Sequence, residues 1–388
     1  MILSVIIINY NAKFFLEQCL CSLSKALGFV EEKFPGQASE IILVDNHSND
    51  GSPEFIKKRF PALMLITNDV NLGFAKANNQ ALSLSKGKYV LFLNPDTLIP
   101  EDSLTHCLSF LEENANSGAV GVRMIDGSGE YLKESKRGLP SPWAAASKLL
   151  GMTAIFPHSK FFSKYYLGHL DENQNNPVDV LSGAFMMVRR DILSKIGGFD
   201  EQFFMYAEDI DLSFRIRQSG FSNNYLAGTC IVHFKGESTI KGNQYSQQFY
   251  EAMRLFVKKH FRSGSSQLLN PLLNISIWFA GKADRLKKFF NPSLQYRPPQ
   301  SRKTFLDGNS ANIEQIIHTL TVTGRSLVGE MDAANEIVFL EGKFLSYHDI
   351  ISRMRAFAKK YSFKIHGAGS QSIVGSDSKD EQGEFIPL

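Results

Sequence analysis

The stretch that decides the fold is Tyr89-Val90-Leu91-Phe92-Leu93-Asn94-Pro95-Asp96. Its first five residues form the most apolar strand-like run of the chain, which is typical of a strand covered on both faces of a sheet. Pro95 ends the run because proline has no backbone N–H to donate to a neighbouring strand. We therefore expect a buried strand that delivers Asp96 to one end of a sheet.

The same pattern extends to both sides of this stretch. Apolar strand-like runs at residues 5–8, 41–44 and 63–66 alternate with helical patterns at residues 14–27, 53–59 and 74–85. A variable excursion from Lys133 to Asn176 follows, and a further strand is expected within Val178–Val188. Hydrophobic strands separated by helices predict an α/β fold with a doubly wound, mostly parallel sheet.

Polar loops follow four of the predicted strands and begin at Asn9, Asp45, Asn68 and Asn94. Each loop alone is explained by turn chemistry, since Asn, Asp, Gly and Ser favour turns and helix caps. Four such loops in series indicate more than turns. Because ligands of open α/β sheets bind beyond the carboxyl ends of the strands, we expect these loops to form one binding rim.

Two further groups of polar residues are candidates for chemistry. The run from Gly197 to Leu212 places five carboxylates among aromatic residues, where desolvation and mutual repulsion raise the pKa of at least one of them. An N-capped amphipathic helix is the alternative. Asp96 at its strand end is a candidate ligand of Mg²⁺ or Mn²⁺, hard cations that prefer oxygen. His233, also at a strand end, is the second candidate ligand. The alternative is the structural role that is usual for a lone histidine.

Composition narrows the function classes. A net charge of +3 and the lack of basic–aromatic motifs argue against nucleic-acid binding. Four scattered cysteines are too few for a disulfide framework, which favours reduced thiols and a cytoplasmic location. The opening residues Met1–Ile8 have no basic leader and are expected to form a buried strand instead of a signal peptide.

A length of 388 residues exceeds one comfortable core and predicts several units. We expect a catalytic domain over residues 1–240, a basic and apolar segment over 241–300, and a small α/β domain of unknown role over 301–388. The apolar run Leu268–Ala280 is too short to cross a bilayer. Its basic flanks favour contact with an anionic membrane surface, and a helix packed on its own domain is the alternative.

In the last unit we expect strands at 304–306, 337–340 and 363–365 and helices at 311–319 and 347–361. The loops Gly308–Ser310 and Gly367–Ser370 follow strands as phosphate loops do. Neither loop completes a dinucleotide-binding fingerprint, so they are weak candidates for a nucleotide site.

Over residues 1–240 the chain resembles the nucleotide-sugar glycosyltransferases of family 2, in particular the rhamnosyltransferase-like branch. The resemblance rests on five ordered motifs, at residues 44–52, 71–79, 93–97, 181–185 and 208–212. It implies a GT-A fold. One departure is that this chain has Asn94-Pro95-Asp96 where many relatives have Asp-x-Asp, which leaves fewer protein carboxylates for a metal ion.

The resemblance also implies roles for individual residues. The residues implied to hold the base and ribose of the donor are Asn9, Asn11, Asp45 and Asn46. Those implied to shape the nucleotide and sugar pocket are Asn68, Gly73 and Asn78. Asp96 and His233 are implied to bind the metal ion. Asp209 is implied as the general base, with Glu208 as the fallback and Asp211 orienting its neighbours. The implied reaction is a single in-line displacement that inverts the anomeric carbon.

The branch favours dTDP-rhamnose as the donor, with UDP or GDP sugars as alternatives. The implied acceptor is a glycan or a polyprenyl-linked sugar at the inner face of the cell membrane, in surface polysaccharide assembly. A processive polysaccharide synthase is disfavoured because the chain has no Gln-x-x-Arg-Trp motif, and a nucleotidyltransferase because it has no glycine-rich basic loop near the first strand. A degenerate, sugar-binding scaffold is the non-enzymatic alternative, and it predicts loss of Asp96, Asp209 or His233, which are all present.

Overall fold

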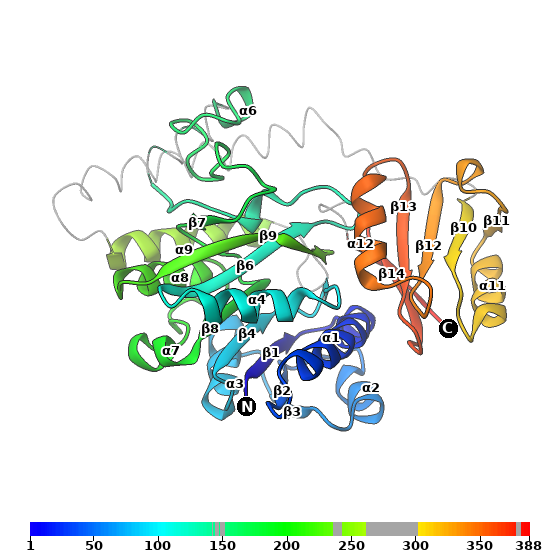
Figure 1. Cartoon of the computed structure of the whole chain (residues 1–388), viewed down its shortest axis with the longest axis horizontal. Coiled ribbons are helices and arrows are strands. Elements are labelled where there is room, and N and C mark those ends of the chain that lie inside the picture. Colours follow the sequence, from blue (N-terminus) through cyan, green and yellow to red (C-terminus); the bar gives the residue numbers. More distant parts are fainter. Residues whose placement is uncertain (142, 144–146, 148–151, 236–242, 261–301, 378–381) are drawn as a thin grey trace.

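Two β-sheets organise the chain in the computed structural model (Figure 1). The structure describes residues 1–388 except 142, 144–146, 148–151, 236–242, 261–301 and 378–381. The expected membrane segment at Leu268–Ala280 therefore lies outside the described residues. Within the described part, no helix is both long enough and apolar enough to cross a membrane.

The first sheet has nine strands, and its main path runs β3-β2-β1-β4-β8-β6-β9-β5, with β7 paired to β9. Its strands are β1 (Leu3–Asn9), β2 (Ser39–Asp45), β3 (Met64–Thr67), β4 (Tyr89–Leu93), β5 (Thr97–Leu98), β6 (Ser117–Ile125), β7 (Asn176–Val178), β8 (Phe185–Arg189) and β9 (Ser222–His233). The strands β3, β2, β1 and β4 are parallel, whereas β8 runs antiparallel to both β4 and β6. The predicted α/β class is confirmed, with parallel pairing confined to β3-β2-β1-β4 and to β6 with β9.

Helices cover both faces of this sheet. They are α1 (Lys13–Lys33), α2 (Ser52–Arg59), α3 (Phe74–Leu84), α4 (Ser103–Glu113), α7 (Arg190–Ile196), α8 (Glu208–Gln218) and α9 (Asn243–His260). The short α6 (Met152–Ile155) and a 3₁₀ turn at Lys133–Ser135 belong to the excursion between β6 and β7, and α6 projects away from the sheet (Figure 1). Side chains of β1 alternate between two cores, as the two-residue period of a strand requires. Leu3, Val5 and Ile7 pack with α1 and α4, and Ile6 and Ile8 pack with α3, α7 and α8.

One element differs from its prediction. The strand expected within Val178–Val188 is split, because β7 ends at Val178 and β8 begins at Phe185. Between them the chain turns through Ser182 and Gly183, and the backbone N–H of Gly183 donates to Asp209. Because the Gly183 N–H is bonded to this side chain, it cannot form a hydrogen bond with a neighbouring strand.

The second sheet has six strands in the order β11-β10-β12-β13-β14-β15. Its elements are β10 (Arg302–Gly308), α11 (Ile313–Val322), β11 (Arg325–Leu327), a 3₁₀ turn (Met331–Ala333), β12 (Glu336–Leu340), α12 (Tyr347–Ala356), β13 (Ser362–His366), β14 (Ser372–Gly375) and β15 (Glu384–Pro387). The first four strands of the order are parallel, and β14 and β15 are antiparallel to their neighbours. The predicted strands and helices of this unit are present, and β11, β14 and β15 are additional.

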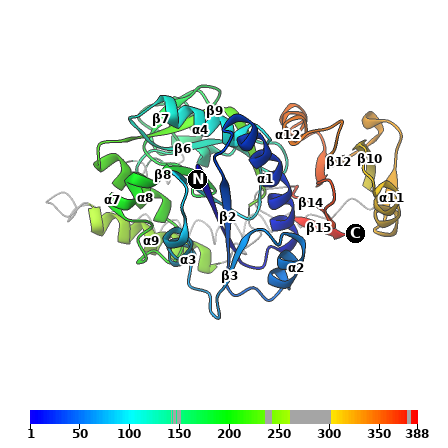
Figure 2. The ribbon, with the colours of Figure 1, turned by 60° about the horizontal axis from the view of Figure 1, so that its bottom comes forward.

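The second sheet lies beside α1 and α2 (Figure 2). The buried Gln18 of α1 accepts a hydrogen bond from Gly367 N–H and donates one to Ser370 Oγ, both at 2.9 Å. Glu101 accepts the backbone N–H groups of Tyr347 and His348 at 2.8 and 3.0 Å, which compensates the positive end of α12. The loop 367–370 therefore takes part in the contact between the two sheets.

Candidate active site

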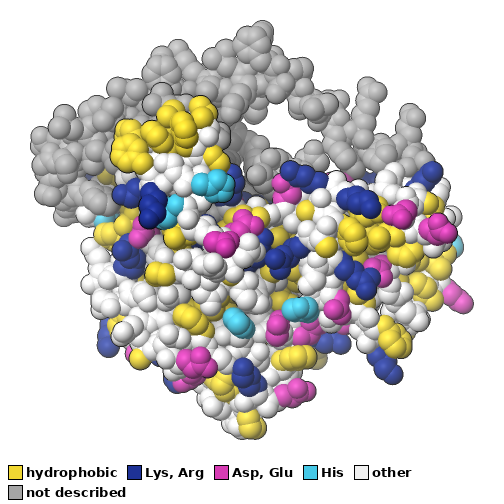
Figure 3. All heavy atoms as spheres, turned by 45° about the horizontal axis from the view of Figure 1, so that its top comes forward, with side chains coloured by type: hydrophobic (Ala, Val, Ile, Leu, Met, Phe, Trp, Pro, Cys, Tyr) yellow, Lys and Arg dark blue, Asp and Glu magenta, His cyan; other side chains and the backbone are white. Residues whose placement is uncertain are grey.

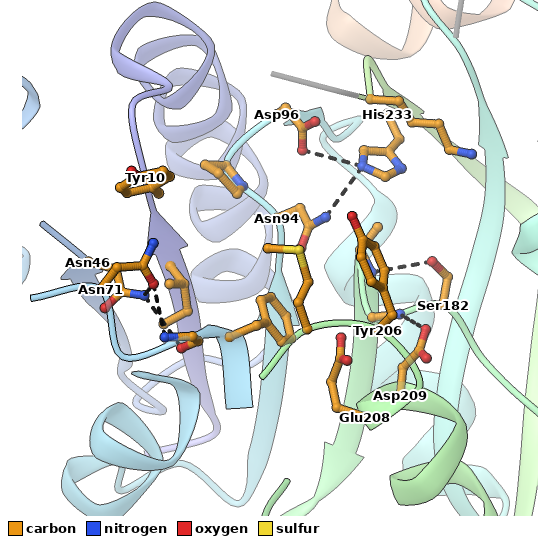
Figure 4. Close-up of a pocket in the computed structure, with 18 residues that line it drawn as sticks. Tyr10, Asn46, Asn71, Asn94, Asp96, Ser182, Tyr206, Glu208, Asp209 and His233 are labelled. Carbon is orange, nitrogen blue, oxygen red and sulfur yellow. Dashed lines mark hydrogen bonds and ion pairs between the residues drawn. The ribbon is translucent and has the colours of Figure 1, made fainter. Parts of the chain in front are cut away.

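A cavity of about 280 Å³ opens at the carboxyl ends of β1 and β4 (Figure 4). This volume is at the lower end of the range for small-molecule sites. The residues that line it are Ile8, Tyr10, Asn46, Asn71, Gly73, Phe74, Asn94, Pro95, Asp96, Ser182, Gly183, Ala184, Met205, Tyr206, Glu208, Asp209, His233 and Lys235. The predicted rim is therefore a real cavity, to which all four loops, after β1, β2, β3 and β4, contribute.

Side-chain amides form one wall of the cavity. Asn46 Nδ2 donates to Asn71 Oδ1 at 2.9 Å, and Asn46 Oδ1 accepts from Leu72 N–H at 3.0 Å. Gly73 starts α3 at a φ of +80°, and a Cβ atom there would stand 2.7 Å from the carbonyl oxygen of Phe204. Only glycine allows this approach, so Gly73 fixes the wall against the loop that leads to α8.

Five residues implied for nucleotide binding do not line the cavity: Asn9, Asn11, Asp45, Asn68 and Asn78. They hold the loops behind it instead. Asn9 Nδ2 donates to Asp45 Oδ1 at 2.8 Å, Asn11 Oδ1 accepts from Asn49 N–H at 2.7 Å, and Asn78 Nδ2 donates to the Phe74 carbonyl at 2.9 Å. Asn68 Nδ2 donates to Asn46 Oδ1 at 3.2 Å and so supports a residue that does line the cavity.

Asp96 and His233 meet on the opposite wall. Pairing of β5 with β9 sets Thr97 opposite His233, which brings Asp96 Oδ1 to 3.3 Å from His233 Nε2. Asn94 Nδ2 lies 3.4 Å from the same ring nitrogen. His233 Nδ1 is buried without a hydrogen-bond partner. The sequence prediction that two distant strand ends would join is therefore correct.

This pair suits a divalent cation. A carboxylate and an imidazole face each other at the edge of the cavity, where a hard cation takes its remaining ligands from water and substrate phosphates. Among the described residues, no group of three or more His, Cys, Asp and Glu side chains gathers as a complete protein-only metal site. The residues present fit an ion that is shared with a phosphorylated ligand.

The third wall carries Glu208 and Asp209 at the start of α8. Two non-glycine residues before them, Tyr206 and Ala207, adopt left-handed backbone conformations with φ of 69° and 61°. Such conformations are sparsely populated for residues with a Cβ atom and concentrate at functional sites. They turn the chain so that the first turn of α8 faces the cavity.

The two carboxylates differ in their surroundings. Glu208 is buried, and its Oε2 has no hydrogen-bond partner. Burial and the neighbouring charge of Asp209 raise the pKa of Glu208 to about 8. Asp209 Oδ2 accepts the Gly183 N–H at 3.1 Å and forms an ion pair with Arg137.

Arg137 is the principal site residue that the sequence interpretation missed. It is buried, and its Nη2 also donates to the Leu181 carbonyl at 2.9 Å. It belongs to the excursion after β6, and the sequence marks it only as one of several basic residues there. Other missed lining residues lie beside predicted ones, as Tyr10 lies beside Asn9 and Tyr206 lies close before Glu208, so adjacency was the available signal.

Asp211 does not line the cavity. It is fully buried on the other side of α8, where its Oδ2 pairs with Arg215 at 2.7 Å and its Oδ1 lies 2.6 Å from both Lys259 Nζ and His260 Nε2. The residue implied to orient its catalytic neighbours therefore joins α8 to α9.

Comparison with known proteins agrees with the resemblance seen in the sequence. The sequence model of glycosyl transferase family 2 matches residues 4–197, half of the chain. The N-acetylglucosaminyl-diphospho-decaprenol L-rhamnosyltransferase of Mycobacterium tuberculosis is 29% identical over 253 residues, which are 61% of this chain and 78% of that protein. The rhamnosyltransferase WbbL of Escherichia coli is 28% identical over 230 residues, which are 57% of this chain and 77% of that protein. A solved structure, that of S. aureus TarS 1-349, is similar to 77% of this chain with 20% identity and a TM-score of 0.46, and the match covers 77% of that chain.

Proposed function

Because this chain belongs to glycosyl transferase family 2 and so is a glycosyltransferase, we propose that it moves one sugar from a nucleoside diphosphate donor to an acceptor hydroxyl. The observation that supports this reaction most directly is the composition of one cavity. Its walls carry paired amides (Asn46 and Asn71), a candidate metal pair (Asp96 and His233) and a carboxylate pair (Glu208 and Asp209). These are the groups that nucleotide binding, diphosphate departure and proton removal require.

The two carboxylates have different roles in this proposal. Because burial and the charge of Asp209 raise the pKa of Glu208 to about 8, Glu208 keeps its proton near neutral pH and is not the base. Asp209 is the general base, and it takes the proton of the acceptor hydroxyl as that oxygen attacks the anomeric carbon. Gly183 N–H and the Arg137 guanidinium hold its Oδ2 in place, and its Oδ1 is fixed by Ile210 N–H at 2.8 Å. One displacement on the face opposite the leaving group inverts the anomeric centre.

Asp96 and His233 would hold Mg²⁺ or Mn²⁺ together with the donor phosphates. When bound, such an ion neutralises the charge that develops on the departing diphosphate. The amides of Asn46 and Asn71 and the ring of Tyr10 face the same cavity from the loops after β2, β3 and β1 and are the groups available to a nucleoside. Because this chain has Asn94-Pro95-Asp96 in place of Asp-x-Asp, His233 takes the role of the second protein ligand of the ion in this proposal.

The donor and the acceptor are proposed from the relatives. Two of them are named as rhamnosyltransferases, and one of these acts on an N-acetylglucosaminyl-diphospho-decaprenol by its name, which favours dTDP-rhamnose and a polyprenyl-linked acceptor. UDP and GDP sugars and a free glycan are the alternatives. Such an acceptor would place the protein at the inner face of the cell membrane, in assembly of a surface polysaccharide.

A panel of nucleotide sugars tests this proposal. The thermal unfolding midpoint is measured with dTDP-rhamnose, UDP-glucose and GDP-mannose, each with and without Mn²⁺, because a ligand bound only by the folded state raises stability by mass action. We expect dTDP-rhamnose with Mn²⁺ to give the largest rise, and to release dTDP when a polyprenyl-diphosphate-linked N-acetylglucosamine is added. Stabilisation without any dTDP release under these conditions would support the scaffold alternative and contradict transfer. Stabilisation by another nucleotide sugar alone would correct the donor.

A further inference from the structure

The excursion between β6 and β7 presents a cluster of large apolar side chains at the surface. Ile155 is 66% exposed, Phe161 59%, Phe156 46% and Trp143 42%. These side chains pack on one another, since the ring centroids of Trp143 and Phe161 are 4.5 Å apart and those of Phe156 and Phe162 5.4 Å apart. Clustered exposure of this kind marks an interaction surface, whereas scattered apolar residues are ordinary.

Hydrogen bonds at the base of the excursion hold its two ends together, and Arg137 joins it to α8. Lys136 Nζ donates to the carbonyls of Leu167 and Leu170 at 3.0 and 2.9 Å, and Gly138 N–H donates to the Tyr165 carbonyl at 2.7 Å. Between these two anchors stands Arg137, which pairs with Asp209 in the cavity. The exposed cluster is thus carried by the same segment that holds the proposed base.

The charge of this segment has one sign. Residues 135–170 contain five lysines and arginines and no aspartate or glutamate. Lys160 and Lys164 are exposed beside the aromatic cluster, and neither is in an ion pair among the described residues. Figure 3 shows hydrophobic side chains gathered on the upper face of the molecule, with Lys, Arg and His side chains next to them.

We propose that the exposed side chains of Trp143 and of residues 155–164 are the surface by which this protein lies on an anionic lipid bilayer. Trp143, Ile155, Phe156 and Phe161 enter the boundary between headgroups and acyl chains, where the apolar face of an interfacial segment is buried and tryptophan is favoured. Lys160 and Lys164 contact anionic headgroups. A second copy of the chain is disfavoured as the occupant, because it would bring two wholly basic segments together.

This proposal goes beyond the proposed function, since it concerns the surface of the excursion and not the contents of the cavity. It also assigns membrane contact to a segment other than 241–300.

Vesicle binding of the full-length protein tests the proposal, with phosphatidylcholine vesicles compared with vesicles that contain 30% phosphatidylglycerol, on the order of the anionic content of natural surfaces. We expect binding to the anionic vesicles, and we expect Lys160→Glu/Lys164→Glu to weaken it by more than tenfold, because each neutralised lysine already removes about fivefold. Phe161→Ser/Ile155→Ser should weaken it by a similar factor.

The chain offers matched controls for both variants. Lys57 and Lys58 of α2 are exposed lysines, and Phe344 is a 79% exposed aromatic residue of the second unit. Lys57→Glu/Lys58→Glu and Phe344→Ser should bind anionic vesicles within twofold of the parent. Equal weakening by control and excursion variants, or equal binding of the parent to neutral and anionic vesicles, would overturn the proposal.

A spectroscopic measurement keeps the proposal testable if a variant folds poorly. Trp143 and Trp278 are the only tryptophans, so a Trp278→Phe protein reports on Trp143 alone. Its emission should shift to shorter wavelength with anionic vesicles and be quenched by lipids brominated near the headgroup. An unchanged spectrum with bound vesicles would place Trp143 in water and refute the assignment. Neither measurement needs a nucleotide sugar, so failure here is distinct from failure of the proposed reaction.

Discussion

The ion pair between Arg137 and Asp209 gives a prediction whose size follows from burial. The two side chains are 10% and 14% exposed, so each charge depends on the other. Arg137→Met would leave the Asp209 carboxylate with the N–H groups of Gly183 and Ile210 as its remaining donors. Breaking a buried pair from one side costs about 3–5 kcal/mol, and the residual exposure places this pair near the lower limit, about 3 kcal/mol. Asp209→Asn leaves the guanidinium unpaired and should cost a similar amount.

The double variant Arg137→Met/Asp209→Asn removes both charges, so its free energy of unfolding should be lower than the parent's by much less than the sum. We expect a coupling of about 2–3 kcal/mol in a double-mutant cycle measured by urea unfolding. Additivity within about 0.5 kcal/mol would refute the reasoning, since independent sites behave that way. Arg137→Lys serves as the control, because lysine keeps the charge but not the fork geometry and should recover only part of the coupling.

Three further predictions concern single side chains. The pKa of Glu208 is raised from 4.5 to about 8, so its neutral form stabilises the fold fully below pH 4.5 and this stability is lost as the pH rises through about 8. Glu208→Gln should therefore flatten the fall of the unfolding midpoint between pH 4.5 and about pH 8, and an unchanged slope would contradict the assignment. His233→Ala and Asp96→Asn should each weaken the effect of Mn²⁺ on donor-induced stabilisation by about 10- to 100-fold in metal concentration, and full retention in both would exclude this pair as the metal site. Gly73→Ala should destabilise the protein by at least 1 kcal/mol more than Gly36→Ala, on the order of an overpacking penalty, because both glycines have positive φ but only Gly73 faces Phe204 closely.

Much of the first sheet was predictable because its strands are continuous apolar runs. Tyr89–Leu93 is a strand with the predicted bounds, and the polar ends of β4 and β9 meet as expected. The second unit was less predictable, since β11, β14 and β15 have only three or four residues each, too few for a periodic pattern. Such short strands are held by pairing with neighbouring strands of the sheet.

The side-chain directions at the site were the harder part. Asn9 and Asp45 end their strands as predicted, but alternation along β1 and β2 sends them to the α1 face, away from the cavity, while Ile8 faces it. A strand-end position therefore identifies the loop but not the face. Arg137 reaches Asp209 across 72 residues through the course of an irregular excursion, and no local pattern encodes such a contact.

The central claim is that Asp209 is the base of a glycosyl transfer reaction, and Asp209→Asn tests it most directly. Turnover of the identified donor and acceptor is measured alongside donor binding by thermal shift, with Asp179→Asn as the control, because Asp179 pairs with Arg217 away from the cavity. We expect a loss of turnover of about 10²- to 10⁴-fold in a folded protein that still binds its donor. Near-parental turnover of Asp209→Asn, with loss of turnover in Glu208→Gln instead, would contradict it.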